Sequence, residues 1–223
     1  GTGSGKTECF LIPIVDALLR EQEQGSLDEH GVRAIIIYPM NALANDQMKR
    51  MRNLLRNYPK ITFGLYNGNT EHSQEKALSN YRQNHAKDGA GVQNPLENEL
   101  ISRETMQQMP PHILITNYSM LEYMLLRPKD DKVFSSARLR YIVLDEAHIY
   151  KGTTGMETSM LMRRLRARLK ATEHIQYILT SATLGGKEAN RSIVEFGQQL
   201  CGLPFKEENI IRSVDASPVI EER

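Results

Sequence analysis

The chain opens with Gly1-Thr2-Gly3-Ser4-Gly5-Lys6-Thr7, a glycine-rich run that ends in a lysine and a hydroxyl residue. Glycines allow several backbone N–H groups to face one anion, and a helix that begins there adds the positive end of its dipole. In such a loop, Lys6 would reach the terminal phosphates of a nucleotide and Thr7 would bind Mg²⁺. We therefore predict that the nucleotide is bound by Thr2, Gly3, Ser4, Gly5, Lys6 and Thr7.

The alternative interpretation of this opening run is a flexible glycine-rich linker. The apolar stretch Cys9–Leu19 that follows suits a buried helix and argues against a linker. Pro13 lies inside that stretch and is expected to kink the helix, because proline has no backbone donor. The full phosphate-loop pattern would begin one residue before Gly1, so we expect this chain to be part of a longer polypeptide.

A second polar segment, Asp145-Glu146-Ala147-His148, directly follows the apolar run Ile142-Val143-Leu144. Hard cations prefer oxygen ligands, so Asp145 is expected to hold Mg²⁺. Glu146 is expected to orient and polarise the attacking water. Two carboxylates after a strand are often only a solvated strand end, and His148 could be a surface histidine. The preceding Gly-Lys-Thr loop favours the catalytic interpretation.

A third segment, Ser181-Ala182-Thr183, closes another apolar run with hydroxyl groups. Alone, this triplet carries almost no information. After a phosphate loop and an Asp-Glu pair, each at a predicted strand end, it indicates a sensor of the nucleotide. We expect Ser181 and Thr183 to hydrogen-bond to the two carboxylates and, with His148, to relay the state of the nucleotide.

Apolar strand patterns alternate with helical ones along the chain, which predicts an α/β fold. Strand patterns cover Val32–Tyr38, Ile61–Tyr66, His112–Thr116, Arg140–Leu144 and Ile175–Leu179, and helical patterns cover Ala42–Asn57, Tyr118–Leu126, Thr154–Lys170 and Glu188–Leu200. Strands separated by helices form a parallel β-sheet with helices on both faces. Ligands of such sheets bind at the carboxyl ends of the strands, where the three polar segments fall.

The stretch from Asn69 to Met109 departs from this pattern, because it is polar and rich in Asn, Gln and Glu. We expect a partly helical excursion from the sheet, with a mobile segment near Asp88–Gly91, and not a separate domain. Residues 1–201 are expected to form one domain. Residues 202–223 lack periodicity and are expected to be an exit segment or linker.

Composition limits the classes of function that remain. The chain has 28 basic and 27 acidic residues, so any surface for nucleic acid must be a local patch. Its two cysteines, Cys9 and Cys201, can form neither a disulfide framework nor a four-cysteine zinc site, which favours a reducing intracellular setting. No apolar run approaches the roughly 20 residues of a membrane span, so no membrane partner is expected.

The three segments together resemble motifs I, II and III of the superfamily 2 helicases of the DEAD/DEAH-box type. The resemblance implies the first RecA-like domain of a P-loop ATPase, with ATP and Mg²⁺ as cofactors and Lys6, Asp145 and Glu146 as catalytic residues. Tyr38–Gln47 resembles motif Ia, Ile115–Leu121 resembles the Thr-Asn segment, and Tyr66–Thr70 lies where relatives have a backbone-contacting turn. These likenesses imply nucleic-acid contacts at Pro39, Asn41, Ala42, Gly68, Thr116 and Asn117.

Within the superfamily, Tyr150–Gly155 followed by Arg163–Arg166 resembles the Lhr-like DNA helicases. That likeness implies translocation 3′ to 5′ along single-stranded or partly duplex DNA, and a cytoplasmic, nucleoid-associated protein of bacteria. The alternative for the cluster Arg163–Lys170 is a solvated helix face. An RNA helicase, and an ATP-driven remodeller of nucleoprotein or defence complexes that separates no strands, also remain open. A small-molecule kinase would share only the phosphate loop.

Two parts of the helicase pattern are missing from this sequence. They are the adenine-reading segment before motif I and the motifs of the second RecA-like domain, including its arginine finger. We therefore expect a second RecA-like domain of the same parent chain as a partner. Because arginine fingers contribute roughly 10³–10⁵ in rate at related sites, the isolated fragment is expected to be nearly inactive as an ATP hydrolase.

Overall fold

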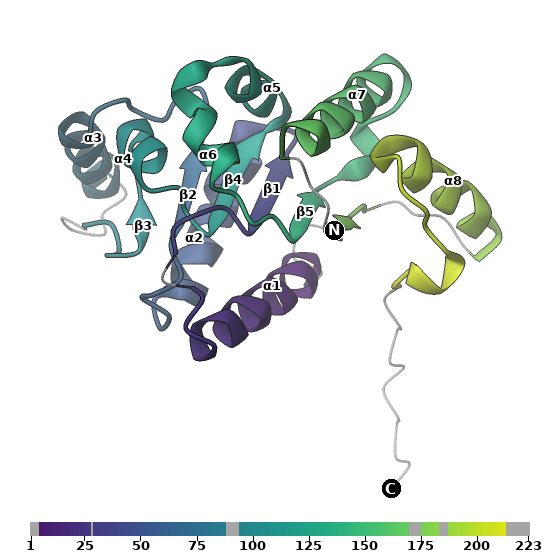
Figure 1. Ribbon diagram of the computed structural model, residues 1–223, viewed down its shortest axis with the longest axis horizontal. Helices are drawn as coiled ribbons and strands as arrows, with labels where there is room; N and C mark the ends of the chain where they lie inside the picture. Colours follow the sequence, from purple (N-terminus) through teal and green to yellow (C-terminus); the bar gives the residue numbers. More distant parts are fainter. Residues whose placement is uncertain (1–4, 28, 88–93, 170–174, 183–186, 213–223) are drawn as a thin grey trace, which may run out of the picture.

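The computed structural model describes residues 5–27, 29–87, 94–169, 175–182 and 187–212. In these ranges the strands form one six-stranded sheet, in the order β3-β2-β4-β1-β5-β6, and every neighbouring pair is parallel (Figure 1). The strands are β1 (Ala34–Tyr38), β2 (Phe63–Tyr66), β3 (Glu99–Leu100), β4 (Ile113–Asn117), β5 (Tyr141–Leu144) and β6 (Gln176–Leu179).

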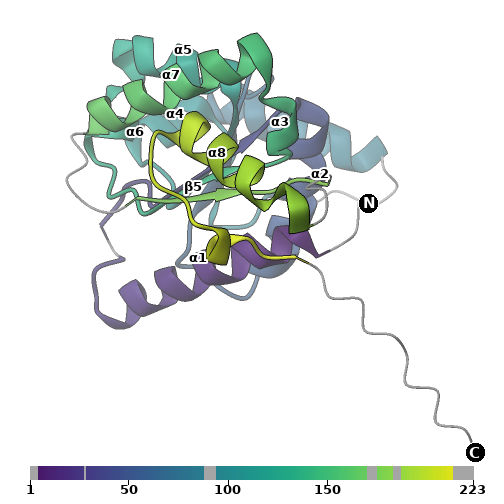
Figure 2. The ribbon, with the colours of Figure 1, turned by 90° about the vertical axis from the view of Figure 1, so that its right-hand side faces the viewer.

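Helices cover both faces of this sheet, as Figures 1 and 2 show. They are α1 (Lys6–Glu23), α2 (Asn41–Leu55), α3 (Gln74–Lys87), α4 (Arg103–Gln108), α5 (Tyr118–Leu126), α6 (Asp131–Ser135), α7 (Gly152–Leu169) and α8 (Asn190–Cys201). Short 3₁₀ turns span Pro128–Asp130, Ala147–Ile149, Lys187–Ala189 and Glu207–Asn209. The predicted α/β fold, a parallel sheet between two layers of helices, is confirmed.

The core lies on both faces of the central strand β1, all of whose residues are buried. Ile35 and Ile37 pack into a cluster with residues of α5 and α7, whereas Ala34 and Ile36 pack into a second cluster with α1 and α2. A strand covered on both faces needs apolar residues at every position. For this reason β1 reads in the sequence as a continuous apolar run.

Helix α1 supplies much of the second cluster, with Phe10, Leu11 and Ile14 buried against the sheet. Pro13 lies on the exposed side of this helix, and the helix runs through it without interruption from Lys6 to Glu23. The proline therefore removes one backbone donor on the solvent side and does not end the element.

The polar excursion from residue 69 to residue 109 returns to the sheet, which the sequence did not predict. Glu99–Leu100 forms β3 and pairs with β2 at one edge of the sheet. The Glu99 carboxylate is buried, and Arg52 of α2 lies 2.7 Å from it. The sequence shows no apolar pattern here, because β3 has only two residues and one of them is charged. The burial of this charge depends on an arginine that is distant in the sequence. The expected mobile segment near Asp88 lies outside the described residues.

The exit segment expected from residue 202 onward begins by packing against the domain. Gly202 ends α8 in the left-handed conformation, which glycine adopts without steric cost. Leu203 and Phe205 then pack against the α5–α7 side of the core. Among the described helices, none has the length and apolar character needed to cross a lipid bilayer.

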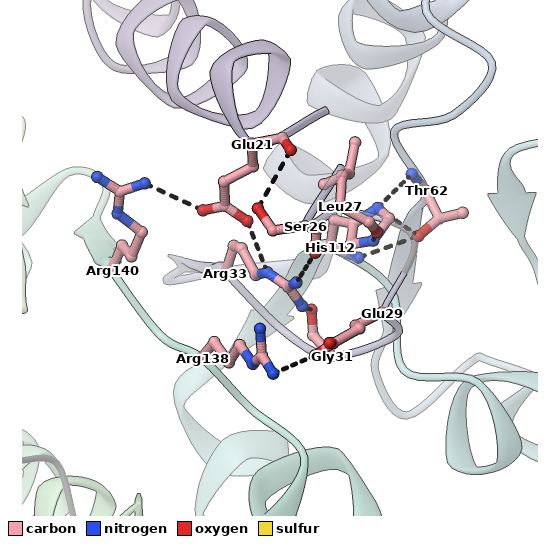
Figure 3. A network of polar contacts seen from close by, with 10 residues as sticks. All are labelled: Glu21, Ser26, Leu27, Glu29, Gly31, Arg33, Thr62, His112, Arg138 and Arg140. Atoms are coloured by element: carbon pink, nitrogen blue, oxygen red, sulfur yellow. Dashed lines mark hydrogen bonds and ion pairs between the residues drawn. The ribbon is translucent and has the colours of Figure 1, made fainter. Parts of the chain in front are cut away.

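The amino ends of the strands are closed by a network of polar contacts (Figure 3). Arg33, which is 1% exposed, donates from Nε to Glu21 Oε2 (3.0 Å) and from Nη1 to the Gly31 carbonyl (2.7 Å). Arg140 donates to the other oxygen of Glu21 (3.0 Å). Arginine and glutamate thus neutralise each other where the chain passes from α1 into β1.

His112 belongs to the same network and is held as a neutral imidazole. Its Nδ1 accepts the backbone N–H of Thr62 (3.0 Å), and its Nε2 lies 3.0 Å from the Leu27 carbonyl, so Nε2 carries the proton. Burial, followed by the charge of Arg33, lowers the pKa of His112 from 6.5 to about 4. Protonation would leave the Thr62 N–H facing a second donor.

We predict that the free energy of unfolding falls as the pH is lowered from about 6.5 to about 4. The unfolded chain binds the His112 proton near pH 6.5 and the folded chain only near pH 4, so folding is favoured above this window. The loss at pH 4 amounts to about 3 kcal/mol for this group. Urea unfolding at several pH values, compared with His112→Gln, isolates the contribution. An equal reduction of the pH dependence by His72→Gln, at an exposed histidine, would contradict the assignment.

Candidate nucleotide site and nucleic-acid face

Helix α1 begins at the phosphate-loop residues that the sequence predicted. Gly5 precedes the helix with φ of 70°, a left-handed conformation that favours glycine. Lys6 and Thr7 are the first two residues of an 18-residue helix, so they lie at the positive end of its dipole. The other predicted loop residues, Thr2, Gly3 and Ser4, lie outside the described residues.

The carboxyl end of β5 carries the two predicted carboxylates. Asp145 is buried, and Glu146 has φ of 48°, the one positive φ among the described non-glycine residues. A side chain in this region costs of the order of 1 kcal/mol or more. The turn is held by the backbone N–H of Ala147, which donates to the Thr180 carbonyl (2.7 Å). The strained turn places consecutive carboxylates at one strand end.

Among the described residues, Thr180 supplies the hydroxyl that bonds the Asp145 carboxylate, and Thr180 was not among the predicted site residues. Thr180 Oγ1 donates to Asp145 Oδ1 and accepts the backbone N–H of Glu146 (3.2 Å). Ser181, which we expected in this role, instead has its Oγ 3.2 Å from His148 Nδ1. Thr183 lies outside the described residues. The strand register identifies Thr180, because Leu144 pairs with Leu179 and the next residues on the two strands are neighbours.

Lys6, Glu146 and His148 form a chain of contacts across the ends of α1 and β5. Lys6 Nζ donates to Glu146 Oε1 (3.2 Å), and His148 Nδ1 lies 3.2 Å from Glu146 Oε2. All three side chains are between one fifth and one third exposed, so water screens the ion pair. The structure therefore joins the first two predicted motifs, and a more strongly charged anion could separate Lys6 from Glu146.

The same place offers oxygen ligands for a divalent cation. Burial raises the pKa of the Asp145 carboxyl, and the hydrogen bond from Thr180 and the nearby Lys6 lower it. A buried carboxylate of this kind is stabilised by a cation, which offsets its lost hydration. Thr7, at the start of α1, is the other predicted ligand, and the residue is 7% exposed.

A second polar cluster lies at the carboxyl ends of β1 and β4. Asn117 Nδ2 donates to Asn41 Oδ1 (2.7 Å), and Asn117 Oδ1 accepts the backbone N–H of Met120 (2.7 Å), which caps α5. These residues border a pocket of about 260 Å³, lined by Pro39, Met40, Asn41, Asn117, Tyr118, Ser119, Ile149, Tyr150 and Thr154. Three predicted nucleic-acid contacts, Pro39, Asn41 and Asn117, thus meet in one concave surface.

The remaining predicted contacts lie differently. Thr116 is fully buried, and its Oγ1 donates to the Tyr66 carbonyl (2.7 Å), so the hydroxyl joins β4 to β2 and does not face a ligand. The likeness to the Thr-Asn segment implied a contact at Thr116, but a sequence likeness does not show which residue at the strand end faces inward. Gly68 is exposed in the turn after β2. Ala42 lies in the first turn of α2.

The arginine cluster on α7 is engaged within the domain. Arg164 pairs with Glu122 of α5, and Arg168 pairs with Asp131 of α6. Arg166 donates to the Gly202 carbonyl after α8 (3.3 Å). These three arginines join α7 to its neighbours, whereas Arg163 is exposed and its Nη1 lies 3.8 Å from Met160 Sδ of the same helix.

Comparison with known proteins agrees with this geometry. The sequence model of the DEAD/DEAH box helicase family matches residues 1–87 and 84–192. The Druantia protein DruE of Escherichia coli is 33% identical over 91% of this chain, and the ATP-dependent helicase Lhr-Core of Methanothermobacter thermautotrophicus is 29% identical over 78%. The chain spans only 15% and 19% of those two proteins.

A solved structure is similar in the same region. The DUF1998 helicase MrfA, bound to DNA and AMPPNP, has 25% sequence identity and a TM-score of 0.60 over 92% of this chain and 23% of its own. Both segments that match the family model thus lie in a fold similar to that of MrfA. In this chain, the Gly-Lys-Thr and Asp-Glu-Ala-His residues are in contact at the strand ends, through Lys6 and Glu146. By sequence and by fold, this chain belongs to the DEAD/DEAH box helicase family.

Proposed function

We propose that residues 1–201 are the first ATP-binding domain of an ATP-dependent DNA helicase or translocase. In this proposal ATP hydrolysis drives movement along one strand, 3′ to 5′, together with a second RecA-like domain that supplies an arginine finger. The observation that carries it is the contact of Lys6 with Glu146 at the edge of the sheet that also holds the Asn41–Asn117 pair. The DNA and AMPPNP bound by MrfA support the choice of ligands.

The chemistry follows from the residues at the end of β5. A triphosphate would attract Lys6 away from Glu146, because it carries more negative charge than one carboxylate. The released Glu146 can then accept a proton from, and orient, the attacking water. Thr7 and Asp145 would hold Mg²⁺, which when bound stabilises charge on the phosphates. The buried, hydrogen-bonded setting of Asp145 fits that task.

A short segment connects this chemistry with the nucleic-acid face. Asp145 and Glu146 serve the nucleotide, and four residues later Tyr150 lines the pocket beside Asn41 and Asn117. A shift of the strained turn at Glu146 would therefore displace Tyr150 in the wall of the pocket. Contacts of amide and backbone groups in this pocket would read the strand backbone and not the bases, so sequence preference should be weak.

A second candidate is an ATP-driven remodeller of nucleoprotein complexes that separates no strands. It uses the same nucleotide site and the same face, because the contact of Lys6 with Glu146 and the Asn41–Asn117 pair require ATP and a nucleic-acid strand but no strand separation. A strand-separation assay on the full-length protein distinguishes the two. ATP- and DNA-dependent hydrolysis without unwinding of any tailed duplex would support the remodeller.

The first prediction separates the roles of Lys6 and Glu146 in the full-length protein. Lys6→Ala should abolish ATP binding and hydrolysis, because the phosphates lose their cation. Glu146→Gln should retain ATP binding and lower turnover by about 10²-fold or more. Nucleotide titration and steady-state ATPase rates measure both, with Lys76→Ala on the exposed side of α3 as the control. Equal loss of ATP binding in both variants would refute this division of labour.

The second prediction concerns Thr180. Thr180→Val keeps the shape but removes the hydroxyl that bonds both Asp145 and the Glu146 backbone. Hydrogen bonds to charged groups contribute about 1.5–3 kcal/mol, so turnover should fall about 10- to 10²-fold. Ser181→Ala, at the neighbouring hydroxyl, should have the smaller effect on turnover at saturating ATP. The reverse order of the two variants would show that Ser181 is the partner that matters.

The third prediction concerns the Asn41–Asn117 pair. Asn41→Ala removes one partner without touching the cap of α5, and should weaken single-stranded DNA binding about tenfold, evenly across sequences. Asn53→Ala, at an exposed position of the same helix, should bind as the parent does. Fluorescence anisotropy with oligonucleotides of several sequences provides the measurement. Loss confined to one sequence would argue against backbone recognition.

A further inference from the structure

Gly68, in the turn after β2, is a glycine that neither the backbone conformation nor the packing of the described chain requires. Its φ lies outside the left-handed region, and a Cβ built on it would meet nothing within 4 Å. Gly64, in β2, is the opposite case, because a Cβ there would lie 2.6 Å from Met106 Sδ and 2.8 Å from the Leu100 carbonyl. A glycine with open space above it is suited to close approach by an external backbone.

The turn that carries Gly68 is fixed from outside the strand. Arg103, at the start of α4, donates from Nη2 to the carbonyls of Asn67 (2.9 Å) and Gly68 (3.0 Å). Its guanidinium carbon lies 5.7 Å from the centre of the Tyr66 ring. One side chain thus holds two consecutive carbonyls of the turn and stacks on the last residue of β2.

The contact between Arg103 and the Asn67–Gly68 turn is not explained by the stability of the fold alone. Arg103 Nε and Asn67 Nδ2 are both buried donors without an acceptor among the described residues, which costs stability. At the same time the guanidinium covers two carbonyl oxygens that would otherwise repel a phosphate group. Arg103 therefore fixes the conformation of the turn and occupies the two carbonyl oxygens.

The position of the turn fits this assignment. The order β2-β4-β1 places Gly68, Asn117 and Asn41 at the carboxyl ends of three adjacent strands. With neighbouring strands separated by about 4.8 Å, these ends span about 10 Å. The buried Thr116 hydroxyl connects the end of β4 to the Tyr66 carbonyl, just before the turn.

We propose that Arg103 is a positioning residue for nucleic-acid binding, which fixes the Asn67–Gly68 turn so that a strand backbone can pass over Gly68. The excursion from residue 69 to residue 109 is then part of the strand-binding surface, since its returning helix α4 carries Arg103. Figure 1 shows α3, α4 and β3 together beside β2. This inference rests on the proposed function of the same face.

The test measures single-stranded DNA binding by anisotropy, and DNA-stimulated ATPase rates, in the full-length protein. Gly68→Ala should leave the thermal unfolding midpoint unchanged and weaken DNA binding about tenfold, because the new methyl group occupies only the path of the ligand. Arg103→Ala should weaken binding by a similar factor and raise the DNA concentration for half-maximal stimulation more than it lowers the rate at saturating DNA. Arg82→Ala, at an exposed arginine of the same excursion, should change neither.

Two further measurements separate positioning from direct contact. The affinity of the double variant for DNA should be less than twofold below that of whichever single variant, Gly68→Ala or Arg103→Ala, binds DNA more weakly. Both substitutions act through one turn, so their effects should not add. Arg103→Lys, which keeps the charge but loses the planar guanidinium over the Tyr66 ring, should stay close to Arg103→Ala. The slope of affinity against salt concentration should not change, whereas loss of a phosphate contact would reduce it by about one.

Full affinity in Gly68→Ala, full rescue by Arg103→Lys, a reduced salt slope or additive effects would each overturn the inference. These results are distinct from failure of the proposed function. In that case the unaltered protein would show neither DNA binding nor stimulation of its ATPase activity by DNA.

Discussion

The parallel alignment of the strands is the constraint on which the rest of this structure depends. Each strand must be followed by a crossover, so helices cover both faces and every strand ends at the same edge. Residues far apart in the sequence are thereby brought into contact, as Lys6 and Glu146 are at 3.2 Å. The predicted nucleotide-binding residues Lys6 and Glu146 and the pocket at Asn41 and Asn117 both lie at these strand ends.

The polar groups at the amino ends of the strands and those at the carboxyl ends lie in opposite kinds of environment. At the amino edge, Arg33 and His112 are buried and their polar atoms are paired, which stabilises the fold and leaves little for a ligand (Figure 3). At the carboxyl edge, Glu146 is held in a strained conformation and Asp145 is buried with a raised pKa. Groups of this second kind gain most from a bound cation or anion, which is why we propose that the ligands bind at the carboxyl ends of the strands.

In the proposed function, the turn at Glu146 would connect the nucleotide with the nucleic-acid face. It is fastened on one side to Thr180, and it leads within a few residues to Tyr150 in the pocket. The excursion after β2 returns as β3 and α4, and so adds Arg103 to the end of the neighbouring strand. The carboxyl edge is therefore assembled from segments that connect the two sites physically.

The sequence by itself determined the parallel sheet, because β-branched apolar runs and helical periods alternate. It also predicted a nucleotide site at Lys6, Asp145 and Glu146, because their types and order are typical of phosphate chemistry. Only the tertiary structure showed that Thr180 bonds Asp145 and that Thr116 is buried. It also showed that the pairing of Glu99 with Arg52 allows a strand with a charged residue to join the sheet. The physical reason is that the partner of a polar group is set by strand register and by distant side chains. A local pattern shows the chemistry that a residue can do, whereas the fold decides what lies within its reach.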